Sequence, residues 1–269
     1  MKKRLFTLFL KLGVTRLAAW HNRRRVVILC YHGVTARERR MPEDPTGLHI
    51  RFARFEAQLD YLRRNFRVVS LGEYLRARHE GRELPDYTAV ITFDDGYRNF
   101  YTMAAPRLRE RGLPASLFLT VGKIKEERRG DGAWSPEDDV EYLSWPEVVE
   151  LKGGGVEVGS HTITHPMLSQ LPLEEAEREL RESFTAVAGR TGDERPPFAY
   201  PFGDYTPEVA ERARTLGYSC ALTTDAGAND PEEDLYTLRR VLIGDDDDEP
   251  AFAARVSGLT ALLSRALPA

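Results

Sequence analysis

Residues 87–96 read Tyr87-Thr88-Ala89-Val90-Ile91-Thr92-Phe93-Asp94-Asp95-Gly96. Seven mostly apolar residues, several of them β-branched or aromatic, are followed at once by two acids and a glycine. Such a run, closed by an Asp-Gly turn signal, predicts a buried strand that ends at Phe93. Two carboxylates therefore stand just past the carboxyl end of a strand.

The same pattern recurs along the chain. Helical patterns and β-rich runs alternate from residue 26 onward, and this order predicts parallel strands with helices outside them, either as an open sheet or as a closed barrel. The expected strands cover residues 26–31, 66–70, 115–119, 156–158, 219–222 and 238–243. The main expected helices cover residues 52–62, 104–111, 173–188 with Gly189 as the stop, 207–216 and 252–263.

Composition narrows the class of protein. The chain has 269 residues, of which 42% are hydrophobic and 30% charged, as in soluble globular proteins with a sizeable core. A net charge of −4 argues against nucleic acid as a partner. No glycine-rich phosphate loop follows a strand, so a nucleotide site is not indicated. Cys30 and Cys220 lie in apolar runs and are expected to be buried thiols.

The N-terminus departs from this acidic average. Residues 1–25 contain eight basic residues and no acid, and the apolar stretch 5–10 is broken by Lys11, so it is too short to cross a bilayer. We expect a basic amphipathic helix over 1–25, followed by a domain over 26–269. The helix could lie on an anionic membrane surface, pack on the domain, or be a signal peptide. A cell-envelope or membrane-associated protein is expected, with a cytoplasmic one as the alternative.

Two histidines close a second strand-like run. His161 and His165 are four residues apart, and Pro166 favours a turn here rather than a helix. Two imidazoles and one carboxylate form a three-ligand metal set that keeps a coordination position open. The second carboxylate of the Asp94-Asp95 pair is then free to act as a base. The alternative for a lone His-x-x-x-His is two loop histidines with ordinary hydrogen bonds.

Three segments together resemble the ordered motifs of a known family. Residues 92–96, 160–166 and 198–203 resemble those of the polysaccharide deacetylases of carbohydrate esterase family 4, the NodB homology domain, and the resemblance covers about residues 26–243. It implies an α/β fold, a distorted (β/α) barrel of seven or eight strands. It also implies a metal-dependent hydrolase that removes N-acetyl or O-acetyl groups from polymers such as chitin, peptidoglycan or poly-N-acetylglucosamine.

The resemblance assigns roles by position. Asp94 would be the base, and Asp95, His161 and His165 would hold one divalent metal ion. Zinc is the first candidate, with cobalt, nickel and iron as alternatives. The Phe202 N–H would help to hold the oxyanion, and Tyr200 and Pro201 would form a wall of the substrate groove.

Two positions depart from the common family pattern. Phe198 stands where many members have the arginine that orients the base, and no histidine follows His165 to supply the acid. The chain resembles the branch that deacetylates poly-N-acetylglucosamine, in which an N-terminal histidine and a late arginine take these roles. This resemblance assigns the acid to His32 and the orienting role to Arg240 rather than Arg239.

The expected partner is an acetylated, N-acetylglucosamine-containing polysaccharide. Trp134, Tyr142 and Trp145, around a polar insertion, are candidates to stack on sugar rings or to pack that loop. Two other functions compete with a polysaccharide deacetylase: a non-catalytic carbohydrate-binding protein on the same barrel, and a deacetylase of small amides. The sequence does not indicate an oligomeric state.

Overall fold

The computed structural model describes residues 2–38, 44, 47–128 and 139–266. Its centre is one parallel sheet with strand order β10-β1-β5-β6-β7-β8-β9, and β4 pairs with β5 beside this path. The strands are β1 (Val27–Tyr31), β4 (Arg67–Val68), β5 (Thr88–Phe93), β6 (Ser116–Leu119), β7 (Glu157–Ser160), β8 (Phe198–Ala199), β9 (Ala221–Leu222) and β10 (Val241–Leu242).

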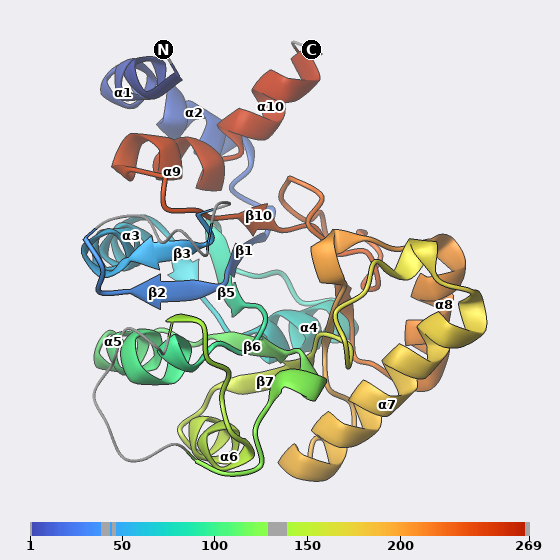
Figure 1. The fold of residues 1–269 in the computed structure, drawn as a ribbon. Helices are drawn as coiled ribbons and strands as arrows, with labels where there is room; N and C mark the ends of the chain where they lie inside the picture. Colours follow the sequence, from blue (N-terminus) through green and yellow to red (C-terminus); the bar gives the residue numbers. More distant parts are fainter. Residues whose placement is uncertain (1, 39–43, 45–46, 129–138, 267–269) are drawn as a thin grey trace.

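The sheet curls into a partly closed barrel (Figure 1). Its two end strands are β9 and β10, and a single parallel bridge between Leu222 and Leu238 links β9 to the segment before β10. Every ladder of the sheet is parallel, which needs crossover connections and so places helices outside. The expected α/β barrel of seven or eight strands is therefore confirmed.

Central strands of the barrel are buried on both faces. All residues of β1 and β5 are buried, and the two strands pair in register from Val27–Ala89 to Tyr31–Phe93. Strands covered on both sides are apolar throughout rather than alternating, which explains the continuous hydrophobic run before Asp94. Both cysteines are free and buried, as the sequence predicts.

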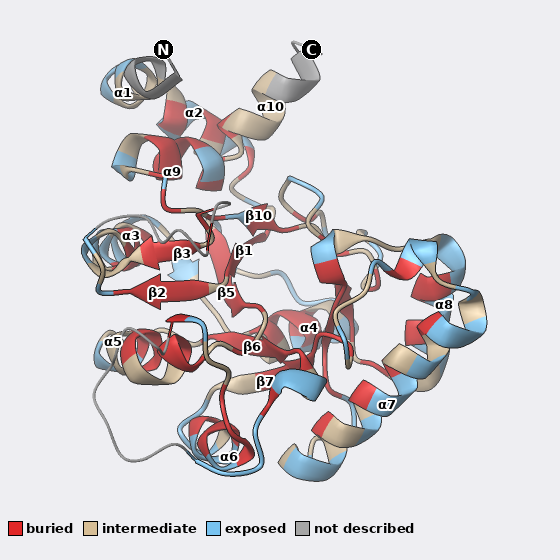
Figure 2. Ribbon diagram, in the orientation of Figure 1, coloured by how far each residue is buried: buried red, intermediate tan, exposed pale blue. Residues whose placement is uncertain are grey.

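Helices surround the barrel and show exposed outer faces (Figure 2). They are α3 (Phe52–Asn65), α4 (Leu71–Glu80), a π-helical turn η1 (Phe100–Ala104) that runs into α5 (Ala105–Glu110), α6 (Trp145–Gly153), α7 (Leu173–Thr191), α8 (Pro207–Leu216), α9 (Glu249–Val256) and α10 (Leu259–Ala266). Short 3₁₀ turns include η2 (Val121–Lys123), η4 (Leu168–Gln170) and η5 (Pro201–Gly203). A separate parallel pair joins β2 (Gly33–Thr35) to β3 (His49–Arg51).

Glycines in the left-handed conformation set several helix ends differently from the sequence prediction. The single N-terminal helix expected over 1–25 is wrong: Gly13 has φ 74° and separates α1 (Lys2–Lys11) from α2 (Val14–His21). Gly189 does not stop α7, which ends two residues later before Gly192 at φ 71°. The last helix is broken at Gly258, with φ 79°, into α9 and α10. Only glycine adopts this conformation without strain, so it serves as a helix end.

None of the helices in the described part of the chain is long and apolar enough to cross a membrane.

Candidate metal centre and its surroundings

Asp95, His161 and His165 come together at the carboxyl ends of β5 and β7. The Oδ1 of Asp95 lies 3.6 Å from Nε2 of His161 and 3.4 Å from Nε2 of His165, and the two Nε2 atoms are 3.1 Å apart. Asp95 follows β5 by two residues, and His161 follows β7 directly. The parallel sheet brings both segments to the same barrel edge, where barrel enzymes build their sites.

The donor set fits a divalent ion. A tetrahedral zinc with bonds of about 2.0–2.1 Å holds its ligand atoms roughly 3.3–3.4 Å apart, close to the three distances found. His161 Nδ1 lies 2.7 Å from the carbonyl oxygen of Ala199, so the Nδ1–H form donates there and Nε2 keeps its lone pair toward the ligand set. Burial lowers the pKa of His161 to about 4, partly opposed by Asp94 and Asp95, which leaves a neutral imidazole near pH 7.

The backbone around this centre is held in an uncommon conformation. Five non-glycine residues of the described chain have positive φ, and four of them line this region: Asp95 at 72°, Thr162 at 65°, His165 at 63° and Phe202 at 59°. Such residues are sparse in proteins and cluster at functional sites, where the surrounding structure holds them against the local strain. Because φ is positive at these residues, their side chains point in other directions than they would at the end of a regular strand.

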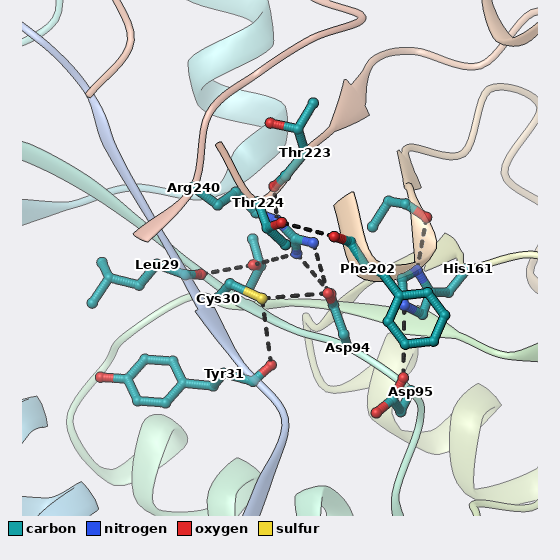
Figure 3. Close-up of polar contacts among 12 residues, drawn as sticks. Leu29, Cys30, Tyr31, Asp94, Asp95, His161, Phe202, Thr223, Thr224 and Arg240 are labelled. Carbon is teal, nitrogen blue, oxygen red and sulfur yellow. Dashed lines mark hydrogen bonds and ion pairs between the residues drawn. The ribbon is translucent and has the colours of Figure 1, made fainter. Parts of the chain in front are cut away.

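Asp94 forms a buried ion pair with Arg240 (Figure 3). Arg240 Nη1 donates to Oδ1 at 2.7 Å and Nη2 to Oδ2 at 2.6 Å, while its Nε donates to the Thr223 carbonyl at 2.8 Å. Burial alone would raise the pKa of Asp94, but Arg240 and His161 hold it well below the usual range. Asp94 is thus a fixed, ionised carboxylate. Arg239 lies elsewhere, 3.3 Å from Glu233.

A second group of potential ligands stands beside the first. One potential ligand atom from each of Cys30, His32 and Asp94 lies within 4.8 Å of the other two. The Cys30 thiol donates to Asp94 Oδ2 at 3.3 Å, and burial raises the pKa of this thiol, so it stays protonated. A protonated thiol and the Arg240 guanidinium on the same carboxylate disfavour a cation here, so the Asp95–His161–His165 set is the candidate metal centre.

His32 is half-buried on the segment that links β1 to β2, and its Nδ1 is buried without a hydrogen-bond partner among the described residues. The structure brings His32 and Arg240 to the Asp94 carboxylate, which adjoins Asp95 in the chain. An unpaired buried imidazole nitrogen is costly unless a ligand or proton serves it, which is in keeping with a functional group.

The third sequence motif forms the turn η5 after β8. Tyr200 is fully buried and donates its hydroxyl proton to the Tyr236 carbonyl at 2.9 Å, and Pro201 is buried as well. Neither side chain therefore presents surface to a polymer, and the groove wall expected from Tyr200 and Pro201 is wrong for these side chains. Phe202, with 61% of its surface exposed, packs edge-on against His165 at 4.6 Å between ring centroids.

Gly203 keeps this turn close to the neighbouring strand end. Its φ is 71°, and a Cβ added there would stand 2.1 Å from Thr224 Oγ1 and 2.4 Å from Thr224 N. The same Thr224 hydroxyl donates to the Phe202 carbonyl at 2.9 Å. A side chain at 203 would force Thr224 and the η5 turn apart and so disturb the hydrogen bond from Thr224 to the Phe202 carbonyl.

The aromatic residues of the polar insertion separate into three cases. Trp145 is buried, so it packs the loop and does not stack on sugar. Tyr142 is half-buried and stacks on Tyr97, with centroids 5.0 Å apart and planes at 23°. Trp134 lies outside the described residues.

Glu179 is a site residue that the sequence analysis missed. Its carboxylate accepts hydrogen bonds from Ile163 N at 2.7 Å, Thr164 N at 3.0 Å and Thr164 Oγ1 at 2.6 Å. It reaches from α7 to the turn between the two histidines and fixes that turn. One of several glutamates on a helix face carries no sequence signal for this role.

Replacing Glu179 with alanine is expected to weaken metal binding by about ten-fold, because outer partners that hold metal ligands typically contribute ~10–100-fold in affinity. Competition with a chromophoric chelator measures the effect. Glu182→Ala, an exposed glutamate on the same helix, is the matched control and should leave the affinity unchanged. Equal affinities for the two variants would remove Glu179 from the site.

The lowered pKa of His161 predicts how stability depends on pH in the metal-free protein. The unfolded chain binds a proton on this histidine below its ordinary pKa of 6.5, whereas the folded chain does so only below about 4. Stability contributed by the neutral form is therefore complete above pH 6.5 and is lost as the pH falls toward 4, by up to about 3 kcal/mol. Urea unfolding after chelator treatment measures it. In His161→Asn this part of the pH dependence should disappear.

The half-barrel and the grouped Asp95, His161 and His165 define an α/β-barrel protein with a candidate metal centre. A sequence profile described as polysaccharide deacetylase matches residues 81–221, more than half of the chain, and the chain belongs to this family.

Two curated relatives match most of the chain. A putative polysaccharide deacetylase, YxkH of Bacillus subtilis, is 25% identical over 236 residues, covering 87% of this chain and 77% of its own length. The poly-beta-1,6-N-acetyl-D-glucosamine N-deacetylase of Escherichia coli K12 is 27% identical over 249 residues; the match covers 79% of this chain but only 36% of that protein.

Solved structures share the fold. IcaB from Ammonifex degensii has a TM-score of 0.71 and 29% identity, with 87% of this chain and 97% of that chain covered. The deacetylase PplD of Streptococcus pyogenes, solved in complex with acetate, has a TM-score of 0.72 at 22% identity, with 86% and 98% covered.

Proposed function

We propose that this protein is a metal-dependent N-deacetylase of an N-acetylglucosamine polysaccharide. The observation that carries the proposal is the juxtaposition at one barrel edge of the Asp95–His161–His165 set and the Asp94–Arg240 pair. The likeness to poly-beta-1,6-N-acetyl-D-glucosamine N-deacetylases, at 27% identity, supports the substrate class. Tyr97 follows Asp95 by two residues and stacks on Tyr142, and this pair offers an aromatic surface for a sugar ring.

Asp95, His161 and His165 would hold the ion, with zinc as the first candidate and cobalt, nickel or iron as alternatives. When bound, such an ion lowers the pKa of water and polarises a carbonyl oxygen. The residues around it do the proton transfers. Asp94 lies beside the ligand set as a carboxylate whose orientation Arg240 fixes through two hydrogen bonds.

In the proposed reaction, Asp94 takes a proton from water as the water oxygen bonds to the acetyl carbon. The Phe202 N–H donates to the oxyanion that forms on the former carbonyl oxygen. Protonated His32 then gives its proton to the amide nitrogen while the carbon–nitrogen bond breaks. The products are acetate and the free amine of a glucosamine unit, so one water is consumed per acetyl group removed.

His32→Ala is expected to lower kcat by about 10²–10³-fold, because general acid catalysis contributes ~10²–10⁴-fold. Metal content should stay at the native level, since His32 is outside the ligand set. Steady-state acetate release and elemental analysis measure the two quantities. An alanine variant that keeps the native kcat would remove His32 from the mechanism.

An acetate-release screen tests the substrate class and the metal together. The purified protein is incubated with N-acetylglucosamine oligomers, peptidoglycan, acetylxylan and small N-acetyl amides, with and without a chelator. We expect release from the N-acetylglucosamine oligomers that stops with chelator and returns with added zinc. Release from acetylxylan alone or from small amides alone would contradict the proposed substrate, and release unaffected by chelation would contradict the metal.

We further propose that the protein acts at the cell envelope, where such polymers occur. The support is the named substrate of the E. coli relative and the basic N-terminus.

A further inference from the structure

We propose that the two N-terminal helices bind an anionic lipid surface through their outer face. This face consists of exposed apolar and basic residues and is called the N-terminal face below: Leu8, Lys11, Leu12, Arg16, Leu17 and Trp20. The proposal stands on these residues alone and does not depend on the activity proposed above.

The inner face of the same helices is already occupied. Phe6, Phe9 and Val14 pack with Ala18 against Ala254 and Leu259 of the C-terminal helices. Asn22 Nδ2 donates to the Ser257 carbonyl at 2.9 Å, which fixes the end of α2 to the body. Figure 1 shows α1, α2, α9 and α10 gathered at one end of the molecule. The helices are thus held by one side, and in the described part of the chain Leu8, Leu12, Leu17 and Trp20 remain exposed.

The outer side carries large apolar side chains that are exposed to solvent. Leu12 is 68% exposed, Leu17 67%, Trp20 54% and Leu8 49%. Leu8 and Leu12 are one turn apart on α1, and Leu17 and Trp20 one turn apart on α2, so each helix presents an apolar stripe. Exposed apolar groups gathered in this way mark an interaction site, whereas single ones do not.

The positive charge of the N-terminal segment indicates an anionic partner. Residues 1–25 carry eight basic side chains and no acid, although the whole chain has a net charge of −4, so residues 26–269 carry a net charge of −12. Lys11 and Arg16 are exposed among the apolar groups, and the Arg23 guanidinium lies 4.5 Å from the Trp20 ring centroid. Leucine and tryptophan interleaved with basic residues on a short helix are typical of helices that lie in the bilayer interface.

The test uses the full chain and two kinds of vesicle, phosphatidylcholine alone and phosphatidylcholine with phosphatidylglycerol. Co-sedimentation and the intrinsic tryptophan emission, to which Trp20, Trp134 and Trp145 all contribute, are recorded at low and high salt. One variant removes the apolar groups (Leu12→Ser, Leu17→Ser, Trp20→Ser) and another reverses the charge (Lys11→Glu, Arg16→Glu). The matched controls change an exposed apolar residue on α6 (Val149→Ser) and an exposed basic residue on α3 (Arg63→Glu).

We expect the native protein and both controls to bind the anionic vesicles, with binding reduced by salt and weak on phosphatidylcholine. Both N-terminal variants should bind at least about ten-fold more weakly. Their far-UV circular dichroism and thermal unfolding should remain native, which shows that the barrel is folded whether or not the proposed activity holds. Native protein that stays in solution with anionic vesicles at low salt overturns the proposal. Self-association lost in the apolar variant without vesicle binding also overturns it, because the face would then be a contact between copies of the chain.

Discussion

Replacing Asp94 with asparagine is expected to lower kcat by about 10³-fold or more, with native metal content. An asparagine cannot take a proton from water, and base catalysis contributes ~10²–10⁴-fold. Asparagine keeps the size of the side chain, and its amide oxygen can still accept a hydrogen bond from Arg240. Single-turnover acetate release and elemental analysis measure the two effects on the same preparation.

Asp94→Asn is also expected to lower the free energy of unfolding. A control must therefore separate the loss of catalysis from the loss of stability. Arg240 has no exposed surface, so removing its counter-charge leaves a buried cation, a change that typically costs about 3–5 kcal/mol. The double variant Asp94→Asn, Arg240→Gln removes both charges and should recover part of the unfolding free energy without recovering activity. Activity that returns together with stability would show that Asp94 acts only through the fold.

Replacing Asp95 with alanine is expected to abolish both metal binding and turnover. Losing a direct ligand should cost more than the ~10–100-fold that loss of an outer partner costs, so we expect affinity at least about 100-fold below native. His161→Ala should behave alike, and should also free the Ala199 carbonyl that accepts from Nδ1. Isothermal titration of the metal-free proteins with zinc measures the affinities.

Asp86→Ala is the matched control for the Asp95 variant, since Asp86 is an exposed aspartate paired with Arg23 at the surface. It should keep native affinity and rate. If Asp95→Ala retained full metal content and full activity, the ligand set proposed for this chain would be wrong.

The fold could be predicted from the sequence because its central strands, β1 and β5, are continuous apolar runs, and helical patterns alternate with the β-rich segments. Because β1 and β5 are buried on both faces, nearly all of their residues are apolar. Such a run can be recognised in the sequence without knowing how the strand packs. Helix ends were less predictable. The sequence does not indicate whether Gly189 or Gly192 ends the helix. In the structure α7 ends before Gly192, which has positive φ.

Part of the site could also be predicted from the sequence. Asp94 and His161 follow β5 and β7 directly, and Asp95 and His165 lie in the turns after these strands, so the parallel pairing of β5, β6 and β7 brings the four residues to one edge of the sheet. The position of Arg240 on Asp94 depends on β10 lying beside β1, a contact between segments more than 200 residues apart, and was inferred only through family resemblance. Glu179 and the four positive-φ residues could not be predicted, since their conformations result from tertiary contacts and not from local sequence preference.

The most direct test of the central claim is anomalous diffraction from a crystal of the native protein soaked with zinc. We predict one strong peak within about 2.0–2.3 Å of Asp95 Oδ1 and of Nε2 of both His161 and His165. A peak between Cys30, His32 and Asp94 instead, or none at either group, would contradict it.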